Sequence, residues 1–388
     1  MGGKQSIQLG VALDKSIYEA GGTVAGFVQV DVHADDVNLP ELGVSLVGSA
    51  FTQVEYEVTV GSGDNQRTEK RTASQTVQLL QLDSKVGDID SSRLVKGARL
   101  QCPFSFELPS TLVSSMPVIL AGSDRAHISY CVKIMTTTPG MLYGKTTKCV
   151  CSVELDVVAA PPALIAPPRV EDDVKVTRCC CIPAGTMRVA AESSLSAYKS
   201  GDHPTVSYEV DNQSSQDVSY VEISLERHVW WEAGGHSSRS IKTIVGTRQD
   251  GVERGAKFGF DADGSFSKAQ IVRAPDQAQS SARNMTLEVP NLAHFSTETP
   301  TIIVTYKLAI KVKTESSFVR DPKVFLPIIA YRLGPAFVKG DAAVNDGSYD
   351  NGDDAIVATV VSIEYAPDPA LIVQVIEAPT VTVVEVVA

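Results

Sequence analysis

Alternation of apolar and polar residues with a period of two runs through most of this chain, and it constrains the fold more than any other feature. Examples are residues 24–32 (VAGFVQVDV), 104–108, 128–134, 150–158 and 302–312. Successive side chains of a β-strand point to opposite faces, so the pattern predicts strands that bury one face. No long stretch has helical periodicity, and only residues 75–82 fit either a helical turn or a strand. The sequence therefore predicts an all-β protein built of antiparallel sandwiches.

Markers from the first half of the chain recur in the second half. Tyr18 and Gly21 in IYEAGG are matched by Tyr198 and Gly201 in AYKSGD, each displaced by 180 residues. Further pairs in the same order are FSFELP with MTLEVP and HISYCVKI with IVTYKLAI. Because both order and spacing are kept, we expect two copies of one sandwich in tandem.

Proline-rich and acidic stretches divide the chain. Pro161-Pro162 and Pro167-Pro168 lie between the two copies, and consecutive prolines do not fit a central strand. Residues 341–354 are rich in Asp, Gly and Asn, and β-prone runs follow, of which we expect at least one to add to a sheet edge. The predicted segments are an N-terminal segment 1–6, an N-terminal sandwich 7–158, a linker 159–170, a C-terminal sandwich 171–335, and an acidic loop with a β-prone tail 336–388.

Charge, hydropathy and cysteine usage exclude several classes of protein. A formal net charge of −12 argues against a nucleic-acid binder, which needs a basic surface. No apolar run approaches the roughly 18 residues of a membrane-spanning helix, and we expect no secretory signal. The seven cysteines are an odd number and include no C-x-x-C pair. Reduced thiols and a cytosolic protein are the simplest interpretation.

The first six residues, MGGKQS, match the N-myristoylation pattern M-G-x-x-x-[ST]. The pattern predicts that Gly2 carries the acyl chain after removal of Met1. One myristoyl chain binds membranes only weakly, with an association constant on the order of 10⁴ M⁻¹. Since Lys4 alone is no polybasic patch, we expect reversible membrane contact that needs a second interaction.

No motif predicts catalysis, a metal site or a cofactor. The chain lacks G-x-S-x-G, H-E-x-x-H and a phosphate-binding loop. Cys179, Cys180 and Cys181 suggest palmitoylation, or zinc ligation together with Cys149 and Cys151. Adjacent cysteines on a strand point to opposite faces, however, so small apolar strand residues are the interpretation we prefer.

Two short features are candidate partner contacts. Trp230 and Trp231 are adjacent on a predicted strand, so one ring is expected to face the core and the other solvent or a partner. An exposed Trp is a frequent binding hot spot. The sequence LLQLD at 79–83 is similar to a clathrin-binding box, but it lies among predicted strands instead of in an extended tail.

Several longer markers follow one another in a fixed order. The N-terminal markers are LDKSIYEAGGTVAGFVQVDV, FELPSTLVSSMP and ISYCVKI, and the C-terminal one begins RCCCIPAGTMRVAAESSLSAYKSGDHPTVSYEV. Their order resembles that of the arrestin family, specifically its arrestin-domain-containing (α-arrestin) branch. The resemblance covers about residues 7 to 335 and rests on many weak markers in one order. It implies a non-enzymatic cytosolic adaptor that binds the cytoplasmic tails of membrane proteins and recruits ubiquitin-ligase, clathrin or other sorting machinery.

Two departures and one alternative accompany this resemblance. Many family members carry P-P-x-Y motifs that bind ubiquitin ligases, whereas the proline pairs here read PPAL and PPRV. The phosphate-sensing residues of receptor-binding arrestins have no match by position. The alternative is a structural coat subunit of the retromer type, which shares the layout of two sandwiches.

Overall fold

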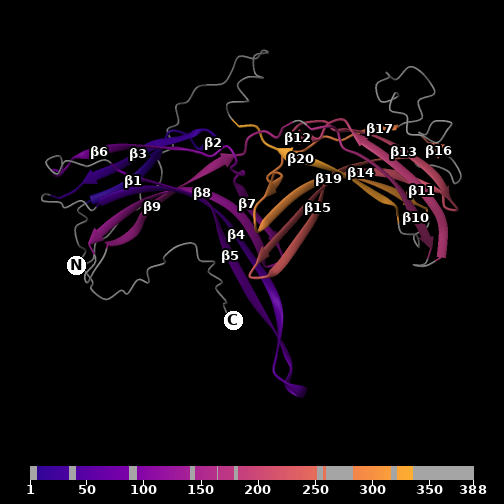
Figure 1. Cartoon of the computed structure of the whole chain (residues 1–388), viewed down its shortest axis with the longest axis horizontal. Helices are drawn as coiled ribbons and strands as arrows, with labels where there is room; N and C mark the ends of the chain where they lie inside the picture. The colour runs from indigo at the N-terminus through magenta and orange to yellow at the C-terminus, as the bar shows by residue number, and fades with distance from the viewer. Residues whose placement is uncertain are drawn as a thin grey trace, which may run out of the picture.

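The computed structural model describes residues 7–34, 41–86, 94–139, 145–163, 165–178, 182–250, 257–258, 283–315 and 321–334. Two β-sandwiches lie next to each other along the long axis of the molecule (Figure 1). Within these ranges the only helical element is a single 3-10 turn, Gly63–Asn65. None of the helical structure in the described part of the chain is long and apolar enough to span a membrane. The predicted all-β fold of two tandem sandwiches is confirmed.

The N-terminal sandwich packs a three-stranded sheet on a six-stranded sheet. The smaller sheet has the order β1-β3-β6, and the larger one has the order β2-β9-β8-β4-β5 with β7 paired to β8. Among the strands that the structure describes in this sandwich, β2 and β9 are the pair that runs parallel. The strand bounds are β1 (Ile7–Leu13), β2 (Ile17–Glu19), β3 (Thr23–Val32), β4 (Glu41–Val60), β5 (Arg67–Lys85), β6 (Arg99–Glu107), β7 (Met116–Ala121), β8 (Asp124–Pro139) and β9 (Lys145–Val158).

The C-terminal sandwich repeats this topology. One sheet has the order β10-β11-β13-β16 with β17 on β13, and the other has the order β12-β20-β19-β14-β15 with β18 on β19. The strand bounds are β10 (Arg169–Arg178), β11 (Ile182–Ser193), β12 (Ala197–Lys199), β13 (Thr205–Ser214), β14 (Val218–Ala233), β15 (His236–Asp250), β16 (Lys257–Phe258), β17 (Arg283–Thr286), β18 (Thr297–Glu298), β19 (Ile302–Thr314) and β20 (Lys323–Tyr331).

The matched Tyr and Gly markers have the same structural role in both sandwiches. Tyr18 lies in β2 and Tyr198 in β12, and each of these short strands pairs in parallel with the last strand of its sheet. Both rings are buried, and each hydroxyl bonds to the turn just before its strand. Gly21 and Gly201 then turn the chain with φ values of 83° and 84°, a left-handed conformation that favours glycine. The internal duplication is therefore visible in the structure.

Alternation places one face of each large sheet in its core. In β19 the side chains at even positions are buried from Ile302 to Val312, as the sequence pattern predicts. Tyr130 in β8 and Tyr306 in β19 are equivalent buried rings, and each hydroxyl donates to a backbone carbonyl. Burying an aliphatic side chain such as Ile302 or Val312 contributes about 1.5–3 kcal/mol.

The structure decides between the two interpretations of residues 75–82. This stretch belongs to β5, which pairs with β4 over its whole length to form a long hairpin that projects from the body of the molecule (Figure 1). The LLQLD sequence is thus part of a paired strand. Gly2, Cys179–Cys181 and the acidic loop and tail 336–388 lie outside the described residues.

Candidate functional site

The tryptophan pair lies at the joint between the two sandwiches. Both residues belong to β14, where alternation turns Trp231 inward and leaves Trp230 half-buried on the opposite face. Trp231 is fully buried, and its Nε1–H donates to the backbone oxygen of Gln53 in β4 at 3.3 Å. Trp231 therefore holds the two sandwiches together and presents no ring surface to a partner. Trp230 is the member of the pair for which a partner contact stays a prediction.

Further contacts place the turn of the β14–β15 hairpin on the β4–β5 hairpin. The hydroxyl of Thr52, a fully buried residue, donates to the backbone oxygen of Glu232 at 2.6 Å. The Tyr56 and His236 rings stack with centroids 3.7 Å apart and an interplanar angle of 11°. Buried hydrogen bonds and a stacked pair at one point fix the relative position of the two hairpins.

A second set of contacts joins the sandwiches where β20 ends. Arg332 donates from Nη1 to Oδ2 of Asp156 in β9 at 2.6 Å, and about a third of each side chain is exposed. Exposure screens this ion pair, so it contributes at most about 1 kcal/mol. Two residues later Gly334 lies so close to the Glu19 side chain that a Cβ would collide with it. The chain thus leaves the C-terminal sandwich against the N-terminal one.

A buried polar cluster lies between these two contact regions. Arg227 in β14 donates from Nη1 to Nδ1 of His294 at 2.6 Å, and the Tyr306 hydroxyl donates to the His294 backbone oxygen at 2.5 Å. Burial first, and the adjacent guanidinium second, lower the pKa of His294 to about 4, against the opposing effect of the Pro117 and Val118 carbonyls. The imidazole is therefore neutral near pH 7, with Nδ1 as the acceptor.

The Arg332–Asp156 ion pair borders a cleft of about 1180 Å³ between the sandwiches. Residues 115–118, 127–130 and 154–156 line it from the N-terminal side, and residues 199–200, 291–293 and 331–333 line it from the C-terminal side. Its walls combine apolar side chains with hydroxyls, two carboxylates and the cations Lys199 and Arg332. The volume slightly exceeds the usual range of about 300–1,000 Å³ for small-ligand pockets.

Two family models match the chain across this architecture. The model described as the arrestin (or S-antigen) N-terminal domain matches residues 7–158, and the model described as the arrestin (or S-antigen) C-terminal domain matches residues 183–332. Together they cover well over half of the chain. The chain belongs to the arrestin family. A search of curated proteins finds no match to it.

The C-terminal arrestin domain carries a cationic sheet face. Lys307, Lys311, Lys313 and Lys323 share the outward side of β19 and β20 with Phe325, and we call these five residues the lysine face. The ammonium groups of Lys307 and Lys323 lie 5.3 and 4.9 Å from the centroid of the Phe325 ring, which is 37% exposed. The negative face of an aromatic ring attracts a cation electrostatically, so each of the two ammonium groups is stabilised over the Phe325 ring.

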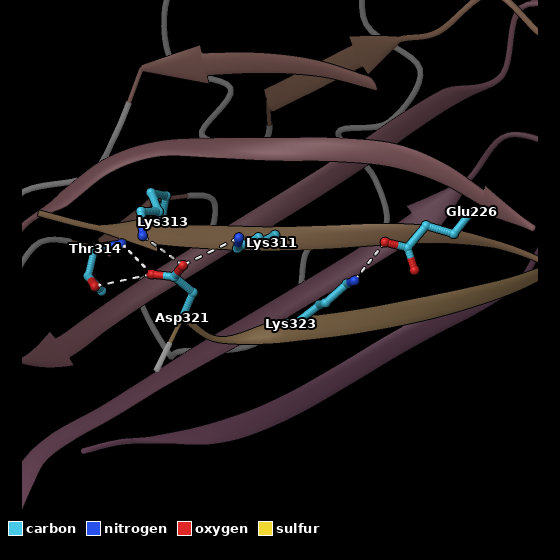
Figure 2. Close-up of polar contacts among 6 residues, drawn as sticks. All are labelled: Glu226, Lys311, Lys313, Thr314, Asp321 and Lys323. Carbon is cyan, nitrogen blue, oxygen red and sulfur yellow. Dashed lines mark hydrogen bonds and ion pairs between the residues drawn. The ribbon is translucent and has the colours of Figure 1, made fainter. Parts of the chain in front are cut away.

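Two carboxylates partly neutralise the lysine face (Figure 2). Asp321 accepts from Lys313 at 3.0 Å and lies 3.4 Å from the Lys311 ammonium, while Glu226 accepts from Lys323 at 2.6 Å. Burial opposes ionisation of Asp321, but hydrogen bonds from Lys313 and the Thr314 backbone outweigh it and lower its pKa. The pKa of Glu226 is lowered in the same way, against burial, by Lys323 and His228.

Sequence reasoning missed both the joint and the lysine face of this arrestin. A signal for the face was available, because Lys311 and Lys313 are two residues apart in an alternating strand, which places them on one side. No local signal predicts that Gln53 meets Trp231, since the two residues are 178 positions apart.

The described residues contain no group of His, Cys, Asp or Glu side chains that suits a metal ion. Four cysteines in these ranges, Cys102, Cys131, Cys149 and Cys151, are free thiols. Burial raises the pKa of Cys131 and of Cys151, which makes both thiols less reactive. Ligation by Cys149 and Cys151 together with Cys179–Cys181 involves residues outside the described part of the chain.

Proposed function

We propose that this arrestin-family chain is a non-enzymatic adaptor that binds cytoplasmic tails of membrane proteins and links them to endocytic or sorting machinery. Arrestin-family proteins are trafficking adaptors and scaffolds in general, and both domains of the family are present here. The observation that carries the proposal is the cleft at the joint, because both arrestin domains line it and the Arg332–Asp156 ion pair joins its two walls.

The mouth of the cleft offers a way to hold an extended peptide. Strand β7 pairs with β8, and its Val118 and Leu120 side chains are 52% and 66% exposed. Val118 lines the cleft. An extended tail that lies along β7 places alternate side chains in the cleft, which is the usual mode of strand addition to a sheet edge. Trp230 is proposed as a second contact on the neighbouring sheet.

The test measures binding of labelled cytoplasmic-tail peptides to the full chain by fluorescence anisotropy. A Val118→Glu variant puts a desolvated carboxylate into the peptide path, and we expect at least tenfold weaker binding of any tail that the wild type binds. Val95→Glu is the matched control, because Val95 is 60% exposed and does not line the cleft. Equal binding by both variants would contradict a cleft site.

Membrane contact through a myristoyl group on Gly2 belongs to the same proposal, together with a cytoplasmic location and reversible association with the plasma or endosomal membrane. Mass spectrometry of the native N-terminus tests the modification. Proximity labelling with wild type and Gly2→Ala then reports partners and the tether together, including any ubiquitin-ligase or clathrin link in the absence of P-P-x-Y. A loss of membrane partners in Gly2→Ala supports the tether.

The same labelling experiment distinguishes the adaptor from a retromer-type coat subunit. An adaptor changes partners when cargo is stimulated, whereas a coat subunit purifies with fixed partners in constant stoichiometry. Constant stoichiometric partners under all conditions would refute the adaptor.

A further inference from the structure

The charged side chains of the cleft pair with one another incompletely. Four charged residues line the cleft: Glu154 and Asp156 from β9, and Lys199 and Arg332 from the C-terminal sandwich. Arg332 is paired with Asp156, and Lys199 has interactions of its own. Glu154 is exposed and forms no hydrogen bond or ion pair with the residues that the structure describes. The charge that the cleft offers to a ligand is therefore the carboxylate of Glu154.

The same wall of the cleft already receives one guanidinium group. Glu154 and Asp156 are two residues apart in β9, so both carboxylates project from the same side of the strand. The Arg332 guanidinium lies on Asp156, with its Nη1 2.6 Å from Oδ2. Glu154 offers a second acceptor of the same kind one step along the strand face. A side chain with the chemistry of Arg332 is thus the natural ligand of this wall.

A second polar group on this wall has no partner. Nδ1 of His127 in β8 is buried and makes no hydrogen bond within the described part of the chain, and the residue lines the cleft. The ring packs against Phe51 with centroids 5.2 Å apart, which holds it in place. Burial first, and Arg125 second, lower the pKa of His127, against the opposing effect of Glu154. A neutral imidazole has one unprotonated nitrogen, which can accept a hydrogen bond from a cation.

We propose that the cleft selects cytoplasmic tails that carry an arginine or a lysine, whose cationic head lies on Glu154 with His127 as a second acceptor. The proposal rests on the cleft site of the proposed adaptor and adds the chemistry of the segment that binds there. Arginine should bind more tightly than lysine, because its planar guanidinium can donate two parallel hydrogen bonds to one carboxylate.

The charge of the protein and the nature of the partner both favour a cationic segment. Cytoplasmic segments next to membrane-spanning helices carry an excess of lysine and arginine. The chain has a net charge of −12, so its long-range field attracts a cation and repels an anion. An anionic tail would bring its charge beside the Glu154 carboxylate, and like charges that meet at an interface weaken binding.

The test compares three synthetic peptides that differ in one type of side chain. Each is Gly-Val-Xaa-Val-Xaa-Val-Gly with the same fluorescent label and uncharged ends, and Xaa is arginine, citrulline or glutamate. Citrulline keeps the shape of arginine without its charge. Fluorescence anisotropy with the full chain measures the dissociation constant of each peptide. We expect the arginine peptide to bind at least tenfold more tightly than the citrulline peptide, and the glutamate peptide to bind most weakly.

Two variants with the same change in net charge separate a local contact from the long-range field. Glu154→Gln removes the carboxylate of the cleft, whereas Glu57→Gln removes an exposed carboxylate of the β4–β5 hairpin that does not line the cleft. We expect Glu154→Gln to reduce the preference for arginine over citrulline below threefold and Glu57→Gln to keep it. His127→Phe keeps a ring against Phe51 and should weaken binding of the arginine peptide about threefold.

Four outcomes would overturn the proposal. These are an arginine peptide that binds no more tightly than the citrulline peptide or not at all, equal losses in Glu154→Gln and Glu57→Gln, unchanged binding by His127→Phe, and tighter binding of the glutamate peptide. The last result would assign the cleft to an anionic tail. If Val118→Glu still weakens the binding of cytoplasmic tails, the adaptor proposal stands while the preference for a cation fails, so the two failures are distinguishable.

Discussion

Two buried threonines near the joint respond in opposite ways to one substitution, Thr→Val. Thr52 is 0% exposed and its hydroxyl donates to the Glu232 carbonyl at 2.6 Å, across the two sandwiches. Thr301 is 4% exposed, but its hydroxyl is buried without a hydrogen-bond partner. In both cases valine keeps the branched shape and replaces the hydroxyl by a methyl group.

The magnitude follows from what each substitution leaves behind. Thr52→Val removes a hydrogen bond and leaves a buried acceptor without its donor, which costs about 1–3 kcal/mol of the free energy of unfolding. Thr301→Val removes a polar group that is buried unsatisfied, so its effect is expected between zero and about 1 kcal/mol of stabilisation. For a sandwich of this size, a 2 kcal/mol loss corresponds to a fall in Tm of about 4–8 °C.

Scanning calorimetry of the full chain, with urea denaturation followed by circular dichroism, measures both effects. We expect Thr52→Val to lower the Tm and Thr301→Val to keep or raise it. Equal destabilisation by the two variants would refute the reasoning, because it would mean that loss of a threonine hydroxyl at this joint is costly irrespective of its partner.

Three further predictions concern titratable groups. The pKa of His294 is lowered to about 4 in the folded state, so the unfolded chain binds more protons between about pH 4 and 6.5. The free energy of unfolding therefore falls as the pH drops through that window. His294→Phe should flatten this pH dependence in urea melts, while the exposed control His33→Gln keeps it. Asp321→Asn leaves two lysines without their carboxylate and should cost about 1–2 kcal/mol in the same melts; no measurable loss would contradict the role given to this ion pair. A double-mutant cycle of Asp156→Ala and Arg332→Ala should give a coupling of about 0.2–1 kcal/mol that decreases with salt, and a larger, salt-independent coupling would argue against the exposure of this pair.

Local pattern was enough to predict most of the fold. A period of two indicates a strand with one buried face, and it placed β3 and β19 close to their observed bounds. The duplication was readable because each copy needs the same buried tyrosine and the same left-handed glycine at its first turn. Only β5 was undecided, since a short run such as QTVQLLQL fits either period until its pairing with β4 is known.

The candidate site was predictable only in part. Alternation predicted that Trp230 and Trp231 face opposite sides, but it could not say which ring is buried. That choice follows from the register of β14, which turns Trp231 toward the core and toward Gln53 of the other sandwich. Register in turn depends on which side chains pack together, and these come from strands far apart in the sequence.

By itself, then, the sequence determined the strands, the repeat and the family resemblance, because each depends on residues close together in the chain. The joint, the cleft and the neutral state of His294 follow only from tertiary packing, because each depends on groups that are far apart in the sequence. Hydrogen bonds such as Thr52 to Glu232 form only after two independently patterned domains have come into contact. The lysine face belongs to both levels. The spacing of Lys307, Lys311 and Lys313 can be read from the sequence of β19, whereas the approach of Lys307 to Phe325 requires the pairing of β19 with β20.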